Sequence, residues 1–172
     1  MTTDIKRILY ATDLSDNAAY ALGHAINMAK RYEATITVLH VIDKTMESSQ
    51  VVLFSYLGQA QLEENLQKRI DYLTAEINQR LKKVIDRQFA DDPESAEIVT
   101  AIEVCLGYPA DEILKKVDVL HCDAIVMGTH GKGIARQAFF GSVAKRILRR
   151  VRKPVFIIPL PEKKDDKGVR DH

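Results

Sequence analysis

Short apolar runs alternate with segments of helical period along most of this chain, and this alternation limits the folds open to it. Residues 5–12 form a short apolar run, and residues 35–42 are apolar and β-branched, as in strands covered on both faces. A strand, a helix and a strand in this order predict a parallel βαβ unit. Between the two runs, small apolar residues recur on one helical face: Ala18, Ala21, Leu22, Ala25, Met28, Ala29 and Tyr32.

A long amphipathic helix is predicted next. Its apolar residues step by 4, 4, 3, 4, 4 and 3 positions along one stripe: Leu62, Leu66, Ile70, Leu73, Ile77, Leu81 and Val84. A coiled-coil seam is one use of such a stripe, but we expect it to pack against the sheet. Asp91-Asp92-Pro93 ends the helix. The preceding segment, 43–58, is polar and then apolar, which fits either a loop tucked onto the core or a flap over a ligand or partner.

The pattern continues to the end of the folded part. Residues 98–106, 124–127 and 155–158 predict three further strands, separated by helices that begin near Pro109 and Ser142. Five strands alternating with four helices predict an α/β fold, a single doubly wound five-stranded parallel sheet that is Rossmann-like. We expect one domain over residues 1–160 and a charged, disordered tail over 161–172.

Composition excludes several classes of protein. The chain has 172 residues and a net charge of +1, so no global charge favours nucleic acid or anionic membrane. We expect no membrane span, because no apolar run approaches the required ~20 residues, and we expect no signal peptide before the first strand. The two cysteines, Cys105 and Cys122, have no metal-ligand spacing. A cytoplasmic protein without a metal site is the resulting prediction.

The stretch from Val126 to Ser142 carries the chemistry. An apolar run stops at Gly128, further glycines follow at 131, 133 and 141, and Ser142 opens a helical segment. Glycines let backbone amides approach a ligand, and a helix N-terminus favours an anion. Residues 124–160 contain no Asp or Glu, which predicts a phosphate site; a glycine-rich surface loop is the alternative. The same span holds these cations: Lys132, Arg136, Lys145, Arg146, Arg149, Arg150, Arg152 and Lys153.

Two common phosphate motifs are excluded. No Gly-x-x-x-x-Gly-Lys-Ser/Thr occurs, so the loop is not a P-loop, and Arg136 stands where the dinucleotide fingerprint needs its third glycine. What remains is the spacing Gly128-x2-Gly131-x9-Gly141-Ser142 between a late strand and a late helix. This spacing resembles the ATP-binding signature of the universal stress protein family.

The resemblance covers residues 1 to about 160. Residues 8–15 look like the family's first strand, 39–43 like its second, and 107–114 like the entry to its third helix. The family's strand order, 3-2-1-4-5, implies that the ends of the first and fourth strands lie side by side. Asp13 and Gly128 are then expected to meet there.

The resemblance also implies roles for individual residues. Asp13 is expected to accept hydrogen bonds from ribose hydroxyls, and Val41 to read adenine through its backbone. Helix capping together with Ser15 is the other role open to Asp13. The phosphates, with any Mg²⁺ that they carry, are expected to bind at Gly128, Gly131, Gly141, Ser142 and Val143. The other expected lining residues are Ala11, Thr12, Met127, Thr129, His130, Lys132 and Gly133.

The implied function is that of an ATP-binding protein in which the nucleotide is a regulatory ligand of a stress response. An ATPase or phosphotransferase is the alternative, but rapid phosphoryl transfer usually needs a carboxylate-held Mg²⁺, and the phosphate loop has no carboxylate. We therefore expect slow hydrolysis at most. Nucleic-acid binding through the basic last helix is disfavoured, because no stacking aromatics interleave its cations.

A homodimer is also expected. The last strand would lie at a sheet edge, where unpaired backbone groups invite a partner strand. Similar proteins of the family pair through this strand. The residues involved would be Val155, Phe156, Ile157 and Ile158.

Overall fold

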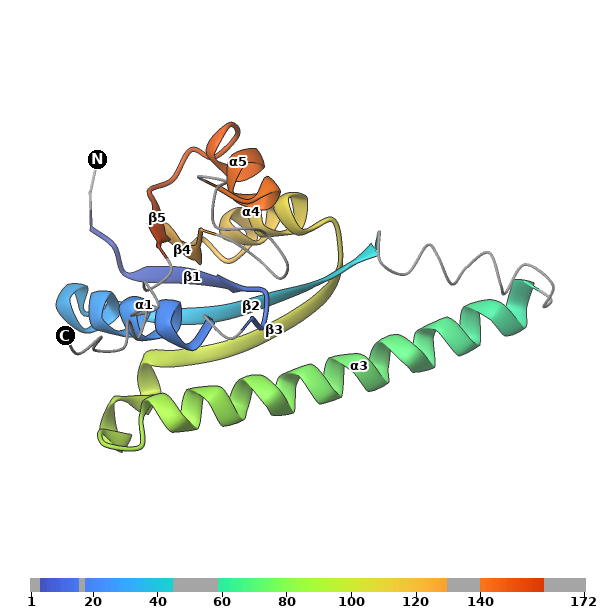
Figure 1. Ribbon diagram of the computed structural model, residues 1–172, viewed down its shortest axis with the longest axis horizontal. Coiled ribbons are helices and arrows are strands. Elements are labelled where there is room, and N and C mark those ends of the chain that lie inside the picture. Colours follow the sequence, from blue (N-terminus) through green and yellow to red (C-terminus); the bar gives the residue numbers. More distant parts are fainter. Residues whose placement is uncertain (1–3, 16–17, 45–58, 130–139, 160–172) are drawn as a thin grey trace, which may run out of the picture.

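The computed structural model describes residues 4–15, 18–44, 59–129 and 140–159. Five parallel strands form one sheet in the order β3-β2-β1-β4-β5: β1 (Arg7–Thr12), β2 (Thr35–Asp43), β3 (Val99–Gly107), β4 (Ala124–Gly128) and β5 (Val155–Ile158). The helices described are α1 (Ala18–Tyr32), α3 (Gln59–Gln88), α4 (Pro109–Val119) and α5 (Ser142–Leu148). The predicted doubly wound sheet and its strand order are confirmed (Figure 1).

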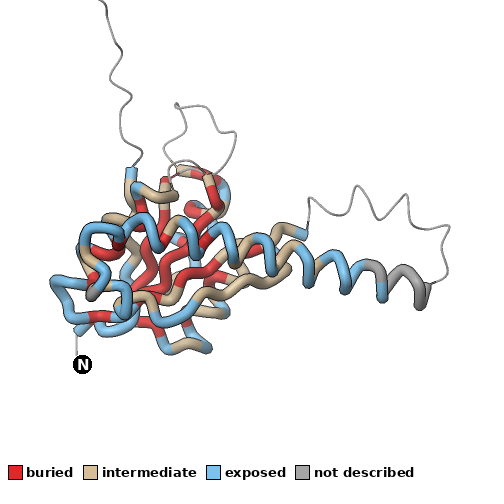
Figure 2. The backbone as a smooth tube through the Cα atoms, turned by 90° about the horizontal axis from the view of Figure 1, so that it is seen from below, coloured by how far each residue is buried: buried red, intermediate tan, exposed pale blue. Residues whose placement is uncertain are grey.

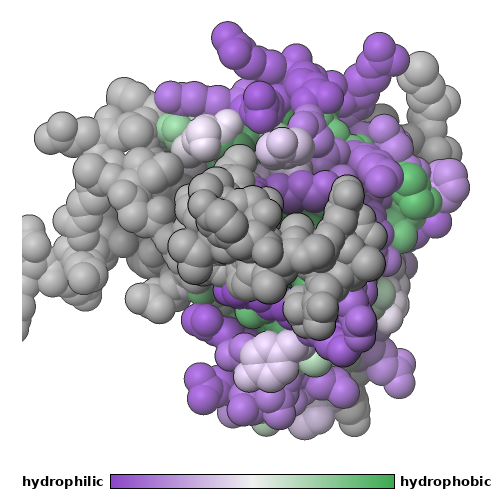
Figure 3. All heavy atoms as spheres, turned by 90° about the vertical axis from the view of Figure 1, so that its right-hand side faces the viewer, coloured by the Kyte–Doolittle hydropathy of each residue, from purple (hydrophilic) through white to green (hydrophobic). Residues whose placement is uncertain are grey.

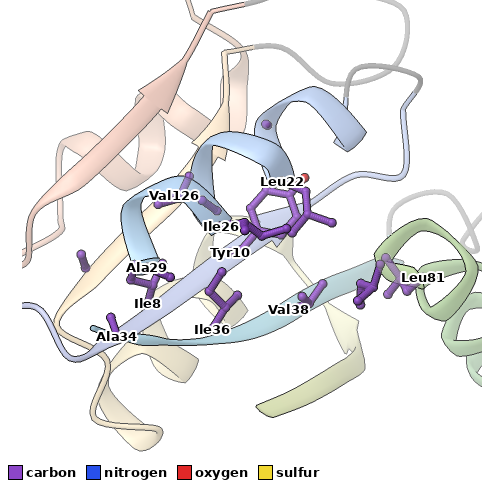
Figure 4. Packing of buried hydrophobic residues seen from close by; sticks show 14 of the residues in the cluster. Ile8, Tyr10, Leu22, Ile26, Ala29, Ala34, Ile36, Val38, Leu81 and Val126 are labelled. Carbon is purple, nitrogen blue, oxygen red and sulfur yellow. The ribbon is translucent and has the colours of Figure 1, made fainter. Parts of the chain in front are cut away.

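Alternate residues of each inner strand enter two separate cores. Ile8 and Tyr10 of β1 pack under α1 and the C-terminal part of α3, together with Val38 of β2 (Figure 4). Leu9 and Ala11 face the other way and pack under α4 and α5. Strands buried on both faces explain why their sequences read as continuous apolar runs.

The long helix departs from the expected packing along part of its length. Its 30 residues span about 45 Å, and in Figure 1 its N-terminal half runs past the sheet. Leu81 is buried in the core and Ile77 packs against it, as the stripe predicts. Leu66 and Ile70 belong to neither core, so the expectation that the whole stripe lies on the sheet is wrong.

The element boundaries also differ in detail. β1 begins at Arg7 rather than Ile5, and at its start the Lys6 and Arg7 N–H groups both donate to one oxygen of Asp123, at 2.9 Å each. A 3₁₀ helix, Pro93–Ile98, precedes β3 and has no counterpart in the prediction. Residues 45–58 and the predicted tail lie outside the described residues.

No helix in the described ranges is long and apolar enough to cross a membrane. On the side toward which α3 extends, most of the described residues in view are hydrophilic, with hydrophobic ones at a few places (Figure 3). Across the same ranges, no three metal-ligating side chains come together. Cys105 and Cys122 are free thiols, and burial raises the pKa of Cys122 to about 11.

Tyr10 provides a test of the core under α1. Burial, and to a lesser degree the charge of Asp13, raises the pKa of its phenol from 10.0 to about 12, and its hydroxyl donates to the Ala18 carbonyl at 2.6 Å. The unfolded chain ionises this group first, so the fold loses stability between about pH 10 and pH 12. Tyr10→Phe lacks both the hydrogen bond and this titration.

We expect Tyr10→Phe to be about 1 kcal/mol less stable than wild type at pH 8. This difference in unfolding free energy should disappear or reverse by pH 11, because the phenol ionises in the unfolded wild-type chain and the folded wild type loses stability. Urea unfolding of both proteins at the two pH values measures this. A difference that stays the same would contradict burial as the cause of the raised pKa.

Candidate functional site

The carboxyl ends of β1 and β4 lie side by side at the middle of the sheet. Ala11 pairs with Met127, so the two chains leave the sheet next to each other. After β1 the chain turns to α1 on one face, and after β4 it turns to α5 on the other. Such a reversal in an open parallel sheet is where α/β proteins bind ligands.

Asp13 stands at this point with one satisfied and one unsatisfied oxygen. Its Oδ1 accepts the N–H of Ser15 at 3.1 Å. Its Oδ2 is buried and has no hydrogen-bond partner among the residues that the structure describes. A buried carboxylate oxygen without a donor costs free energy, so this arrangement is unfavourable for a purely structural turn.

The next residue holds a strained backbone. Leu14 has a φ of +61°, which is uncommon for a residue with a large side chain. Its N–H donates to Thr12 Oγ1 at 3.2 Å, and its carbonyl accepts from Arg80 Nη2 at 3.3 Å. The Leu14 side chain is buried in the core. Side chains from β1 and α3 therefore fix the turn that carries Asp13.

Two other non-glycine residues that the structure describes also have a positive φ, because each lies at the C-terminal end of a helix. Glu33, with a φ of +51°, directly follows α1, and His121, with a φ of +50°, lies just after the end of α4. Around each, an N–H donates five residues back, from Ala34 to Ala29 and from Cys122 to Val117, at 2.9 Å. These are Schellman helix ends. Leu14 lies at no helix end, so its strain marks the candidate site.

The chain after β4 returns to the end of the same strand. Thr129 donates its N–H to the Ile158 carbonyl at 3.0 Å, and its own carbonyl accepts the Gly141 N–H at 2.8 Å. Gly141 is the N-cap of α5 and makes no side-chain cap, so the first-turn N–H groups at Ser142 and Val143 have no partner within the helix. The start of α5 therefore lies beside the end of β4.

β2 contributes to the same edge. In a parallel ladder every second residue directs its backbone groups to the same side, and the Thr35 N–H donates to the Lys6 carbonyl of the β1 side at 2.9 Å. Val41 therefore turns its backbone groups toward β1, one residue past the last pair, Thr12 with His40.

Most predicted site residues fall within this region. The structure places them at the carboxyl ends of β1, β2 and β4 and at the start of α5: Ala11, Thr12, Asp13, Val41, Met127, Gly128, Thr129, Gly141, Ser142 and Val143. His130, Gly131, Lys132 and Gly133 lie outside the described residues. Ala11, Val41 and Met127 have buried side chains in the core under α4 and α5, so only their backbones are suited to contact a ligand.

Sequence reasoning missed two residues that shape the site. Leu14 and Arg80 carry no local signal, because their contact joins positions 66 apart in the chain. His40 of β2 has a satisfied hydrogen bond, since its Nδ1 lies 2.8 Å from the Thr12 carbonyl. Since a carbonyl only accepts, Nδ1 carries the proton.

Comparison with known proteins identifies the family. The model of the universal stress protein family matches residues 4–159. The chain belongs to the universal stress protein family. Two proteins of Methanocaldococcus jannaschii are similar to it over 158 residues: universal stress protein MJ0531, 34% identical over 92% of this chain and 84% of that protein, and universal stress protein MJ0577, 27% identical over 92% and 97%.

Solved structures of the family share the fold. The structure of MJ0577 has a TM-score of 0.73 at 25% identity and covers 93% of this chain and 99% of that one. The structure of UspA from Lactobacillus plantarum has a TM-score of 0.69 at 22% identity and covers 90% of this chain and 97% of that one. A universal stress protein solved in complex with cAMP has a TM-score of 0.53 at 18% identity and covers 91% of this chain and 98% of that one.

The unsatisfied oxygen of Asp13 leads to a prediction about stability. Asp13→Asn keeps an oxygen for the Ser15 N–H but removes the buried charge, so we expect ligand-free Asp13→Asn to gain about 1 kcal/mol of unfolding free energy. Asp13→Ala, which also loses the Ser15 contact, serves as the matched control and should gain less. Denaturant unfolding at pH 7.5 measures both. A loss of stability in Asp13→Asn would show that Oδ2 is satisfied in the free protein.

Proposed function

We propose that this universal stress protein binds ATP at the carboxyl ends of β1, β2 and β4 as the regulatory ligand of a cytoplasmic stress response. The observation that carries the proposal is the buried, unpartnered Oδ2 of Asp13 at the reversal point of the sheet. A nucleoside supplies the missing donor, because ribose hydroxyls donate hydrogen bonds that a carboxylate accepts well.

The proposed pose follows the order of the strands. Adenine would lie over β2 at Val41, one residue past the last pair of β2 with β1, Thr12 with His40. The ribose would meet Asp13. The phosphates would lie at Gly128 and the start of α5, where free N–H groups and the helix dipole favour an anion.

Charge supports the same orientation. The chain from residue 124 to residue 160 contains no carboxylate, so no fixed negative charge opposes a triphosphate along this stretch. Any Mg²⁺ would be carried by the phosphates themselves. The universal stress protein solved with cAMP has an adenine nucleotide on the same fold, though at 18% identity the likeness extends to the fold alone.

We propose that the nucleotide acts as a ligand more than as a substrate. Fast phosphoryl transfer uses a group that orients water or an acceptor beside the terminal phosphate, and usually a carboxylate-held metal. In the proposed pose, the carboxylate of Asp13 is engaged by the ribose, at the opposite end from the terminal phosphate. Slow hydrolysis at most is the consequence.

We expect Gly141→Val to weaken ATP binding at least about tenfold while the sheet still folds. Gly141 has φ −64° and ψ 162°, which any residue adopts, so the loss would come from filling space beside the phosphates. Ser142→Ala should cost less, on the order of 1–2 kcal/mol, because one hydroxyl is removed and the helix N–H groups remain. ATP should bind more tightly than GTP, whose base reverses the donor and acceptor pattern at Val41.

Calorimetric titration of each variant, with circular dichroism to check folding, measures these effects. Gly23→Ala in α1 is the matched control, since a Cβ there would meet its nearest neighbour, Gln88 Oε1, at an ordinary 3.5 Å. The site assignment is wrong if folded Gly141→Val binds ATP as tightly as wild type, or if wild type prefers GTP.

We also propose a homodimer that pairs β5 with its copy. β5 is an edge strand in the sheet order. The carbonyls of Pro154 and Ile158 accept N–H groups from the β4 side, so the backbone of Ile157 points away from β4 toward the free edge. Unpaired groups at such an edge form hydrogen bonds with a second strand.

The predicted dimer is tested best by removing a backbone donor. Ile157 also packs against the core under α4 and α5, so a charged residue there would damage the fold. We expect Ile157→Pro, which removes the outward N–H, to be monomeric, and Ile157→Ala, which loses the side chain but keeps the N–H, to stay dimeric. Sedimentation at about 20 μM protein, a concentration at which a micromolar dimer is populated, distinguishes them. A monomeric wild type would exclude the dimer.

A further inference from the structure

The N-terminal half of α3 carries an apolar stripe that the other described elements do not cover. Figure 2 shows this part of the helix as mostly exposed where it runs past the sheet. Leu66 is 37% exposed, and Ile70 and Leu73 are half-buried but packed against neither core. Ile77 stands at the boundary, where it contacts the core under α1 and keeps part of its surface open.

The spacing of this stripe is that of a two-helix seam. Leu66, Ile70, Leu73 and Ile77 are separated by 4, 3 and 4 residues, the alternation of d and a positions in a heptad repeat. Over these residues the stripe would pack into the stripe of another helix as knobs into holes. Tyr72, although 68% exposed, lies off this seam.

We propose that the exposed stripe of α3 binds the same stripe of a second copy of this chain, with the two helices antiparallel. One register pairs every apolar position. Ile70 meets the partner's Leu73, and Leu66 meets the partner's Ile77, with each layer repeated by symmetry. The two helices would overlap along about 17 Å, from residue 66 to residue 77.

Charge complementarity selects this register. Arg69 and Glu76 flank the seam on one side. In this register, Arg69 of each helix would face Glu76 of the partner helix, so the pair would occur twice by symmetry. Both are exposed, and neither forms an ion pair with any residue that the structure describes. The opposite flank carries the neutral pair Gln67 and Thr74.

The remaining charges of this half-helix are arranged differently. Glu64 and Lys68 pair within the helix at 2.6 Å, four residues apart, on its outer side. A parallel arrangement would place Arg69 opposite a threonine and would bring both folded bodies to the same end of the pair. The antiparallel arrangement places the bodies at opposite ends and uses both unpaired charges.

A charge exchange tests the proposal. We use the Ile157→Pro background, so that pairing through β5 does not contribute, and measure sedimentation equilibrium from 10 μM to 1 mM at low salt. Single variants Arg69→Glu and Glu76→Arg should weaken dimerisation about tenfold, because two attractions become two repulsions. The double variant Arg69→Glu, Glu76→Arg should restore it to within about threefold of the background.

Lys68→Glu is the matched control. It makes the same change of charge one residue away, but on the outer side of the helix, and should leave the dimer unchanged. A monomer at all concentrations, or a double variant no tighter than the single ones, would overturn the proposal. An equal loss in Lys68→Glu would do so as well, because it would show a general effect of charge.

Cross-linking tests the register in the otherwise unaltered chain. In a Cys105→Ser background, whose remaining Cys122 is buried, we introduce Arg69→Cys in one protein and Glu76→Cys in another. The antiparallel register predicts that the mixture forms a disulfide-linked dimer at least about ten times faster than either protein alone. A cross-link that forms as fast in Arg69→Cys alone would contradict it. Neither experiment involves the nucleotide, so their outcome is independent of the proposed function.

Discussion

The parallel pairing of β1 with β4 is the constraint on which the rest of the structure depends. It aligns Ala11 with Met127 and brings together the ends of two strands whose chains leave to opposite faces. Both cores depend on it, since alternate residues of β1 enter each. The same pairing brings the two departing chains close to the end of β2 and the start of α5.

The turn after β1 is stabilised from outside rather than by its own residues. Leu14 adopts a left-handed conformation that typically costs about 1–3 kcal/mol, and Thr12, Arg80 and the burial of its side chain offset this cost. What the arrangement achieves is the placement of Asp13 with one oxygen held and one unused. A turn optimised for stability alone would satisfy both oxygens, so the cost is consistent with a binding role.

The sequence predicted the parts of this structure that depend on local patterns. Buried parallel strands give continuous apolar runs, so all five strands and their class were predictable to within two residues. The candidate site was predicted from the glycine spacing and the family resemblance. The strain at Leu14 and its contact with Arg80 were not predictable, because neither leaves a local pattern and their contact spans 66 positions. The stripe of α3 was recognised, but periodicity does not say where a sheet ends, so its uncovered half was missed.

The most direct test of the account is a thermodynamic cycle on the ribose. Calorimetry would compare ATP with 2′,3′-dideoxy-ATP on wild type and on Asp13→Asn, which keeps the turn but removes the charged acceptor. If Oδ2 binds the ribose, wild type should prefer ATP by about tenfold or more, and the preference should largely vanish in Asp13→Asn. Equal affinities of wild type for the two nucleotides, or a preference that survives the substitution, would contradict the central role given to Asp13.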